Sequence, residues 1–296
     1  MLKRDWIKIR TYSTQRIKEW EKQTKATVLT TFDTISPSRY NLLANTLGHD
    51  AHDQMPPSGT VIPPCWHHVY FPPRTQEHDL AHDGYETEFF PPPPFSQRMW
   101  VGARMTWNPS NPLKIDDQVK MVTQLDHAQV REGRLGESVM VWINKDIENQ
   151  KGWSMQEQRC LVYHPPQEEA NTTRGIQVRK SPGFYRTMTP SSILLFRYSA
   201  LTFNSHKIHF DHLYATQVEK HPACLVHGPL SGTLLMHLLG TQTNRPLSTF
   251  EYKCLMPLYV HQPLTLAGRQ SKDKTYELWI TNSAGHLAVK GTATVA

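Results

Sequence analysis

The chain has 296 residues, of which 38% are hydrophobic and 20% charged, and its formal net charge is +6. This composition is typical of a globular protein with one large domain or two smaller ones. No apolar run reaches the roughly 18 residues that would span a bilayer. The basic residues are scattered, without an aromatic-basic stripe, so we predict neither a membrane nor a nucleic acid as partner. The positive charge would suit a phosphorylated ligand.

The four cysteines contain no Cys-x-x-Cys pair, so neither a zinc knuckle nor a small disulfide scaffold is indicated. We therefore expect a reducing compartment, either the cytoplasm or the mitochondrial matrix. Residues 1–26 are rich in lysine and arginine and are predicted to be a charged N-terminal extension. A transit peptide is the alternative, against which the acidic residues Asp5, Glu19 and Glu21 count.

Residues 27–164 are predicted to form a first unit. It opens with a helix over 35–48, for which Ser36 is a suitable N-cap and Pro37 suits the first turn. The proline clusters of residues 49–97 exclude central strands and long helices, so we expect an ordered excursion over the body. Short segments bounded by turn residues then predict strands over 98–107, 118–126, 138–147 and 158–164.

Residues 165–190 are polar and predict a linker to a second unit, residues 191–296. That unit begins with an apolar run, 192–203, which we interpret as a strand. Helices are expected over 212–220 and again after Gly228-Pro229. Strands are predicted near 248–256, 263–270, 274–282 and 287–295.

The two units share an order of helical material followed by antiparallel strands. Locally, residues 139–163 resemble residues 276–295. We interpret the chain as two fused copies of one α+β unit, each wrapping a sheet round its helix. Pairing of the two units edge to edge would remove exposed strand edges.

A cluster of polar side chains follows the apolar run of the second unit. Asn204, His206, His209 and Asp211 stand within eight residues. Histidine and aspartate exchange or orient protons, and histidine does so near neutral pH. The cluster is therefore the first candidate for a catalytic site.

This cluster also carries a resemblance to a known family. Leu201-Thr-Phe-Asn-Ser-His-Lys-Ile-His-Phe-Asp211, followed by Leu225-Val-His-Gly228, resembles the MaoC-like enoyl-thioester hydratases and hydroxyacyl-thioester dehydratases. Upstream segments, including Arg98-Met99-Trp100, are similar to the fused branch with mesaconyl-CoA and itaconyl-CoA hydratases and fungal mitochondrial-type dehydratases. The resemblance implies an α+β double hot-dog fold and a hydro-lyase that acts on an enoyl or 3-hydroxyacyl thioester. It implies no cofactor beyond the substrate's own carrier, coenzyme A or an acyl carrier protein, and a possible homodimer.

The resemblance assigns His209 as general base, since a histidine of ordinary pKa near 6.5 can activate water at neutral pH. The Gly228 N–H, at a helix N-terminus, would stabilise the thioester oxyanion. Asn204 stands where the family signature has an aspartate, and an amide cannot accept a proton. It would orient water or substrate, or cap a helix. Asp211 would hold the tautomer of His209 or cap the next helix.

Five further residues are candidates for binding the substrate. Arg98 would pair with a substrate anion, although a salt bridge within the sheet is an equal alternative. Trp66 and Trp100 are candidate walls of an acyl pocket formed by the N-terminal half, which lacks a copy of the motif. His206 and His227 are the remaining candidates from the C-terminal half.

Other classes of function stay open. His206, Asp211 and His212 approach the zinc signature of metallo-β-lactamase-like hydrolases, but the spacing is one residue too long. The pair His78 and His82 lies in a proline-bounded loop. We predict no metal. The same fold could serve a thioesterase, an isomerase, a biosynthetic cyclase or a non-catalytic acyl-binding subunit, because fold does not determine function.

Overall fold

The computed structural model describes residues 14–49, 51–133, 136–166 and 175–296. Its strands are β1 (Val28–Thr34), β2 (Gln97–Trp107), β3 (Gln118–Gly133), β4 (Gly136–Asn149), β5 (Gly152–His164), β6 (Phe184–Met188), β7 (Leu247–Cys254), β8 (Leu264–Lys272), β9 (Thr275–Thr281) and β10 (Leu287–Val295). Its α-helices are α2 (Pro37–Thr46), α3 (Ser192–Thr202) and α4 (Gly228–Gly240). Short helical turns are η1 (Trp66–Val69), η2 (Glu77–Asp79), η3 (Lys207–His209) and η4 (Tyr214–Val218).

Within the described residues, the strands form one ten-stranded antiparallel sheet in the order β1-β3-β4-β5-β2-β7-β10-β9-β8-β6. The two halves of the chain meet at β2 and β7, where Ala103 pairs with Tyr252 and Met105 with Phe250. The predicted α+β class and the edge-to-edge pairing of the two units are therefore confirmed. The expected two sheets are one continuous sheet, because this pairing extends the hydrogen-bond ladder across the junction.

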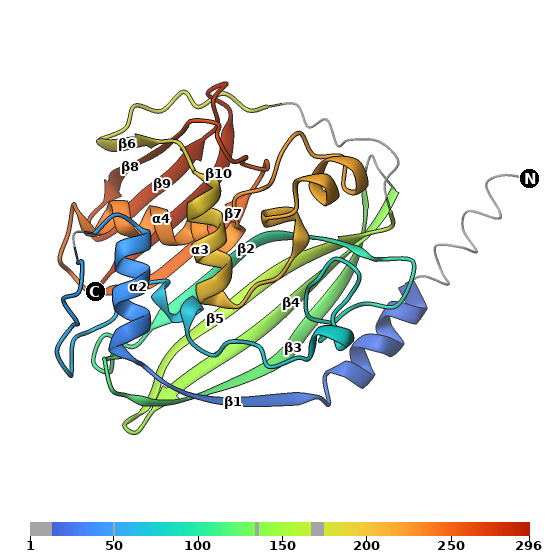
Figure 1. Cartoon of the computed structure of the whole chain (residues 1–296), viewed down its shortest axis with the longest axis horizontal. Helices are drawn as coiled ribbons and strands as arrows, with labels where there is room; N and C mark the ends of the chain where they lie inside the picture. Colours follow the sequence, from blue (N-terminus) through green and yellow to red (C-terminus); the bar gives the residue numbers. More distant parts are fainter. Residues whose placement is uncertain (1–13, 50, 134–135, 167–174) are drawn as a thin grey trace, which may run out of the picture.

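The helices gather on one face of this sheet. Figure 1 shows α2 and α3 in front of the sheet with α4 running across it, and α4 contacts β2, β8 and β9. Helix α4 is the central helix of the C-terminal half, and its Leu230 and Leu235 are fully buried in the main hydrophobic core with Phe250. Across the described chain, no helix is both long and apolar enough to cross a membrane.

The N-terminal half is covered differently. A second hydrophobic core joins Leu125 and Val141 of its sheet to Phe89 and Phe95 of the proline-rich excursion and to Ile17. Ile17 belongs to a helical segment, residues 14–24, within the predicted N-terminal extension; residues 1–13 lie outside the described chain. The excursion is thus an ordered part of the body, and the space between the two cores stays open as a cavity.

Most predicted elements of the sheet are observed, and four details differ from the prediction. Residues 192–203, expected as a strand, form helix α3, because the Ser191 hydroxyl caps it by accepting from the Leu194 N–H and its face packs on α2. Strand β6 lies inside the predicted linker, and β1 was not predicted. The helix expected over 212–220 is the shorter turn η4, of π-helical type.

Candidate active site

A cavity of about 1220 Å³ lies between the two halves of the chain. Its wall takes Lys145 and Arg159 from the N-terminal half and Asn204, His209 and Gly228 from the C-terminal half. Small-ligand pockets usually have roughly 300–1,000 Å³. The cavity therefore has room for a ligand larger than most small molecules, and both halves of the chain would contact it.

His209 ends the turn η3 and lines the cavity while remaining only 8% exposed. Its Nδ1 lies 2.9 Å from the Leu225 carbonyl oxygen, which can only accept, so Nδ1 carries the proton. Burial lowers the pKa of His209 to about 4, although the hydrogen bond to Leu225 acts in the opposite direction. At neutral pH the ring is therefore neutral, and its Nε2 presents a lone pair. No other described residue donates a hydrogen bond to that atom.

The ring of His227 packs against the ring of His209. The two rings are stacked, with centroids 3.7 Å apart and planes inclined by 20°. His227 is fully buried, does not line the cavity, and has its Nε2 2.8 Å from the Ser199 hydroxyl. Burial, together with the neighbouring His209, lowers the pKa of His227 well below its usual value. The structure therefore places His227 against the His209 ring and not on the cavity wall, so that the predicted contact of His227 with substrate stays a prediction.

Asn204 and Asp211 occupy different positions relative to the cavity. Asn204 lines it, and its Oδ1 accepts a hydrogen bond of 3.0 Å from the His206 N–H. Asp211 does not line the cavity, and its Oδ1 accepts from the Tyr214 N–H at 2.9 Å, which caps the helical turn that begins at His212 and leads into η4. The predicted contact between Asp211 and His209 is therefore replaced by the capping alternative.

Gly228 begins helix α4 at the cavity wall. A Cβ atom at this position would lie 2.3 Å from Cδ1 of Trp100, so only glycine allows β2 and the start of α4 to approach this closely. Pro229 follows in the first turn, where its missing N–H removes no helical hydrogen bond. The Gly228 N–H belongs to the unpaired donors of a helix N-terminus and carries part of the positive end of the helix dipole.

Arg98 also lines the cavity, but its guanidinium is already occupied. Nε and NH2 donate to the two carboxylate oxygens of Asp83 at 2.9 and 3.2 Å, and NH1 donates to the Glu86 carbonyl at 2.7 Å. The pairing of Arg98 with a substrate anion is corrected to the salt-bridge alternative. Asp83 has a second neighbour, because its Oδ2 lies 3.4 Å from Nε2 of His206. His206 itself lines the cavity, and its ring is perpendicular to that of His209.

The two tryptophans differ in the same way. Trp100 lines the cavity, with the Arg159 guanidinium 5.2 Å from its ring centre. Trp66 is buried in the main core beside Tyr40 and does not reach the cavity. Its predicted role as a pocket wall is therefore wrong. Its neighbours His67 and His68 reach the wall instead, because η1 turns them toward β5.

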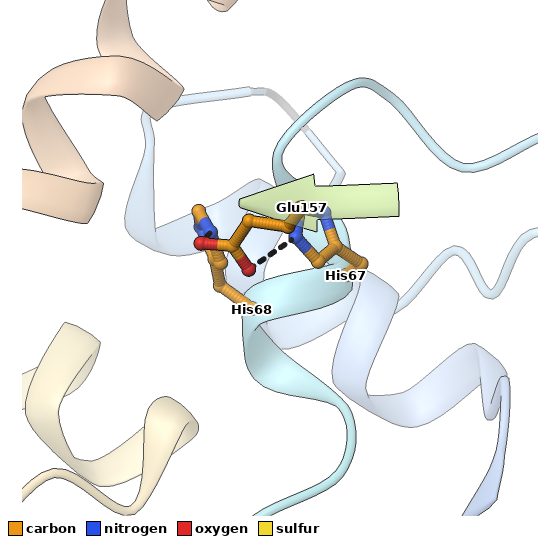
Figure 2. Close-up of side chains that lie close together, drawn as sticks. All are labelled: His67, His68 and Glu157. Carbon is orange, nitrogen blue, oxygen red and sulfur yellow. Dashed lines mark hydrogen bonds and ion pairs between the residues drawn. The ribbon is translucent and has the colours of Figure 1, made fainter. Parts of the chain in front are cut away.

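A polar cluster occupies the wall formed by the N-terminal half. Figure 2 shows the Glu157 carboxylate between the rings of His67 and His68. Oε2 of Glu157 lies 3.2 Å from Nε2 of His67 and 2.7 Å from NH2 of Arg159, and Oε1 lies 3.5 Å from Nε2 of His68. Burial opposes the charge on Glu157, but Arg159 and the two histidines outweigh it and hold its pKa well below the usual value. Nearby, burial lowers the pKa of Lys145 to about 7.

The cluster has the ligand types of a divalent-metal site. One atom each of His67, His68 and Glu157 lies within 4.8 Å of the others. Arg159, however, already occupies one oxygen of the single carboxylate and balances its charge, so the cluster fits a buried ion-pair network better than a cation site. In the part of the chain that the structure describes, the alternative set around His206 and His212 does not converge in this way.

Comparison with known proteins decides the family. A family model for hydroxyacyl-thioester dehydratase type 2 matches residues 65–260. This chain belongs to that family. It is 34% identical over 227 residues to a mesaconyl-C(4)-CoA hydratase of Chloroflexus aurantiacus, covering 74% of this chain and 80% of the relative. It is 28% identical over 249 residues to a mitochondrial hydroxyacyl-thioester dehydratase type 2 of Schizosaccharomyces pombe, covering 75% and 81%.

Solved structures show the same fold. HtdX of Mycobacterium tuberculosis superposes with a TM-score of 0.67 at 15% identity, covering 91% of this chain and all of that one. A MaoC-like dehydratase from Phytophthora capsici gives 0.66 at 12% identity, covering 91% and 95%. A further Mycobacterium tuberculosis protein, described as a double hot-dog, gives 0.57 at 10% identity, covering 90% and 95%. The predicted double hot-dog fold is therefore confirmed for this member of the family.

The sequence alone did not reveal the polar cluster. Glu157 and Arg159 stand two residues apart, which places both side chains on one face of β5. Two charged residues on one face of a strand are the signal that could have indicated a polar cavity wall here. No local sequence pattern indicated that His67 and His68 contact Glu157, because about ninety positions of the chain separate them from it.

Proposed function

We propose that this dehydratase-family chain is a hydro-lyase that adds water to, or removes it from, an enoyl or 3-hydroxyacyl thioester. The observation that carries the proposal is the state of His209: a neutral ring, its proton held on Nδ1 by Leu225, with Nε2 available in a cavity that also contains the start of α4. A neutral imidazole with a free nitrogen is the group a general base requires.

The geometry supports one sequence of proton transfers. In hydration, a water proton passes to His209 Nε2 while the water oxygen forms a bond to the β-carbon. The electron pair of the carbon–carbon double bond moves to the thioester carbonyl, giving an enolate. The proton on Nε2 then passes to the α-carbon, which restores the neutral ring. Dehydration is the reverse, so one histidine serves both directions.

The enolate needs a hydrogen-bond donor at its oxygen. Gly228 supplies a backbone N–H at the N-terminus of α4, where the helix dipole favours negative charge. Removal of one such preorganised donor typically raises a barrier by about 3 kcal/mol. Trp100 holds this turn in place by packing directly against Gly228. The oxyanion site thus depends on a contact between the two halves of the chain.

The narrower features of the substrate are also proposals. One relative is named for a coenzyme A thioester and the other for a mitochondrial hydroxyacyl thioester. We propose that the acyl group is carried by coenzyme A or by the phosphopantetheine arm of an acyl carrier protein, with no further cofactor. The net charge of +6 suits either anionic carrier. We further propose a location in the cytoplasm or mitochondrial matrix, and a homodimer.

A panel of thioesters tests the function. Purified protein is mixed with crotonyl-coenzyme A, a medium-chain 2-enoyl-coenzyme A, mesaconyl-C(4)-coenzyme A and the corresponding acyl carrier protein thioesters, and products are followed by mass spectrometry. We expect gain of one water by at least one member of the panel. Release of free thiol without hydration would instead indicate a thioesterase. Light scattering of the same sample measures the oligomeric state.

A further inference from the structure

The position of the family's catalytic carboxylate is occupied by Asn204, which leaves the water with one identified base. The Asn204 Oδ1 already accepts from the His206 N–H, so even its hydrogen-bonding capacity is partly used. A water that attacks carbon has two hydrogens, and two acceptors would orient it better than one. A second acceptor should therefore line the cavity near His209.

His206 is placed to be that acceptor. It lines the cavity, and its ring centroid lies 5.5 Å from that of His209, with the planes at 88°. Because the two O–H bonds of water diverge by about 105°, a water donating two hydrogen bonds of about 2.8 Å spans about 4.5 Å between its acceptors, and ring nitrogens can lie closer together than the ring centroids. The separation of the rings is compatible with a single water held between one nitrogen of each.

The surroundings of the Nε2 atom of His206 favour one tautomer of its neutral ring. Nε2 is buried and makes no hydrogen bond, but Oδ2 of Asp83 lies 3.4 Å away, and a carboxylate this close favours a proton over a lone pair on Nε2. Asp83 is 1% exposed, and its carboxylate accepts hydrogen bonds from Nε and NH2 of Arg98 and from the Tyr85 N–H. With the proton on Nε2, the lone pair of His206 is on Nδ1. No described residue donates a hydrogen bond to this Nδ1.

Hydrogen bonds connect residues 82–84, which include Asp83, to residues 205–207, which include His206. The Lys207 N–H donates to the Asp83 carbonyl at 2.8 Å, and the Ser205 hydroxyl donates to the Gly84 carbonyl. Gly84 has φ +81°, and a Cβ there would lie 2.4 Å from the Ser205 carbonyl oxygen, so this approach requires glycine. The Lys207 ammonium also donates to the His82 carbonyl at 2.7 Å. These contacts fix the relative position of Asp83 and His206 across the two halves.

We propose that Asp83, from the N-terminal half, is a positioning residue that fixes His206 with its proton on Nε2, so that Nδ1 of His206 and Nε2 of His209 together hold the attacking water. The water proton is transferred to His209 as described above, and His206 accepts only a hydrogen bond. Asp83 thereby compensates for the missing carboxylate without touching the substrate. This inference rests on the proposed hydro-lyase function.

The surroundings keep His206 neutral. Burial, with His209 and Arg98, lowers the pKa of His206 well below its usual value. The other groups near the ring are Tyr85, His82 and His221, and of these the two histidines act in the same direction. A neutral His206 retains the acceptor on Nδ1 over the whole neutral pH range.

The tautomer is tested without any substrate. Long-range proton–nitrogen NMR spectra of the full-length protein with 15N-labelled histidine distinguish the two tautomers of a neutral ring. We expect His206 to carry its proton on Nε2 in the wild type and to lose this preference in Asp83→Asn. A wild-type His206 protonated on Nδ1 would overturn the proposal, whatever reaction the protein catalyses.

Kinetics test the role of the second acceptor, with the panel thioester that the wild type hydrates fastest. We expect His206→Ala to lower kcat by about 100-fold, because misplacing a reacting group by about 1 Å can cost a factor of this size. In that background, Asn204→Asp returns a carboxylate to the cavity wall and should recover at least about 10-fold, which loss of a purely structural residue would not allow. Full activity of His206→Ala, or no recovery in the double variant, would contradict the proposal. A wild type inactive on every thioester would instead refute the proposed function.

Arg98→Lys is the matched control for Asp83→Asn. Both variants weaken the same buried ion pair, but only Asp83→Asn removes the carboxylate that faces His206. We expect both to lower the melting temperature, while only Asp83→Asn changes the tautomer of His206 and lowers kcat by about 10-fold beyond Arg98→Lys. Equal effects of the two variants on tautomer and kcat would reduce Asp83 to a structural role.

Discussion

Gly228 and Trp100 touch so closely that a single methyl group would not fit between them: a Cβ on Gly228 would lie 2.3 Å from Cδ1 of the indole. One residue begins the central helix of the C-terminal half, and the other belongs to the strand of the N-terminal half that joins the two units. The half that lacks the histidine motif thus positions the N–H that we propose as the oxyanion donor.

Gly228→Ala should therefore damage both catalysis and stability. The added methyl group must displace the indole or the start of α4, and such overpacking typically costs about 1–3 kcal/mol. We expect a lower melting temperature and a fall in kcat of about 10-fold or more as the N–H moves away from the thioester oxygen. Gly240→Ala, at the other end of the same helix with open space around its Cα, is the control and should not lower stability. Equal effects of the two substitutions would refute the packing argument.

The pH dependence of hydration should reflect the low pKa of His209. The base works in its neutral form, and burial lowers its pKa to about 4, so kcat/KM should rise as pH increases through about 4 and stay level above about pH 5.5. Rapid pH-jump assays measure this limb before acid unfolding interferes. Lys145→Met serves as a control, because the pKa of Lys145 near 7 could add a second step. An acidic midpoint near 6.5 would show that His209 is solvated.

Stability should fall in acid for the same physical reason. His67 and His209 have folded pKa values of about 4, below the unfolded value of 6.5, so the unfolded state binds more protons between these limits. Each contribution is fully present above about pH 6.5 and is lost as pH falls toward 4, to the extent of about 3 kcal/mol per residue. Urea unfolding at several pH values measures the slope. His67→Gln should reduce it, whereas His78→Gln, at an exposed site, should not.

The fold could be predicted from the sequence to the extent that its signals were local. The alternating strands and the Pro229-initiated helix carry such signals, and both were recognised. Residues 192–203 were assigned to the wrong class, because a short apolar run has no decisive period and only packing on α2 makes it a helix. His209 was selected through the family motif. The partnership of Asp83 with His206, and of Glu157 with His67, depends on contacts between distant segments that no local pattern encodes.

Glu157→Gln should destabilise the protein strongly. The carboxylate is fully buried and balances Arg159, so its neutralisation leaves an uncompensated cation in the cavity wall. Breaking a buried pair in this way costs about 3–5 kcal/mol. Glu148→Gln is the control, since its bond to Lys120 is largely exposed and should contribute at most about 1 kcal/mol. Chemical denaturation compares the two; similar losses would mean that Arg159 finds another partner.

The central claim is that His209 activates the water, and His209→Ala measures it most directly. His212→Ala, an exposed histidine three residues along the chain, is the matched control. With the preferred enoyl thioester, we predict that His209→Ala lowers kcat at least about 100-fold while the fold is retained, and that His212→Ala hydrates at the wild-type rate. Wild-type hydration by a folded His209→Ala variant would contradict the account.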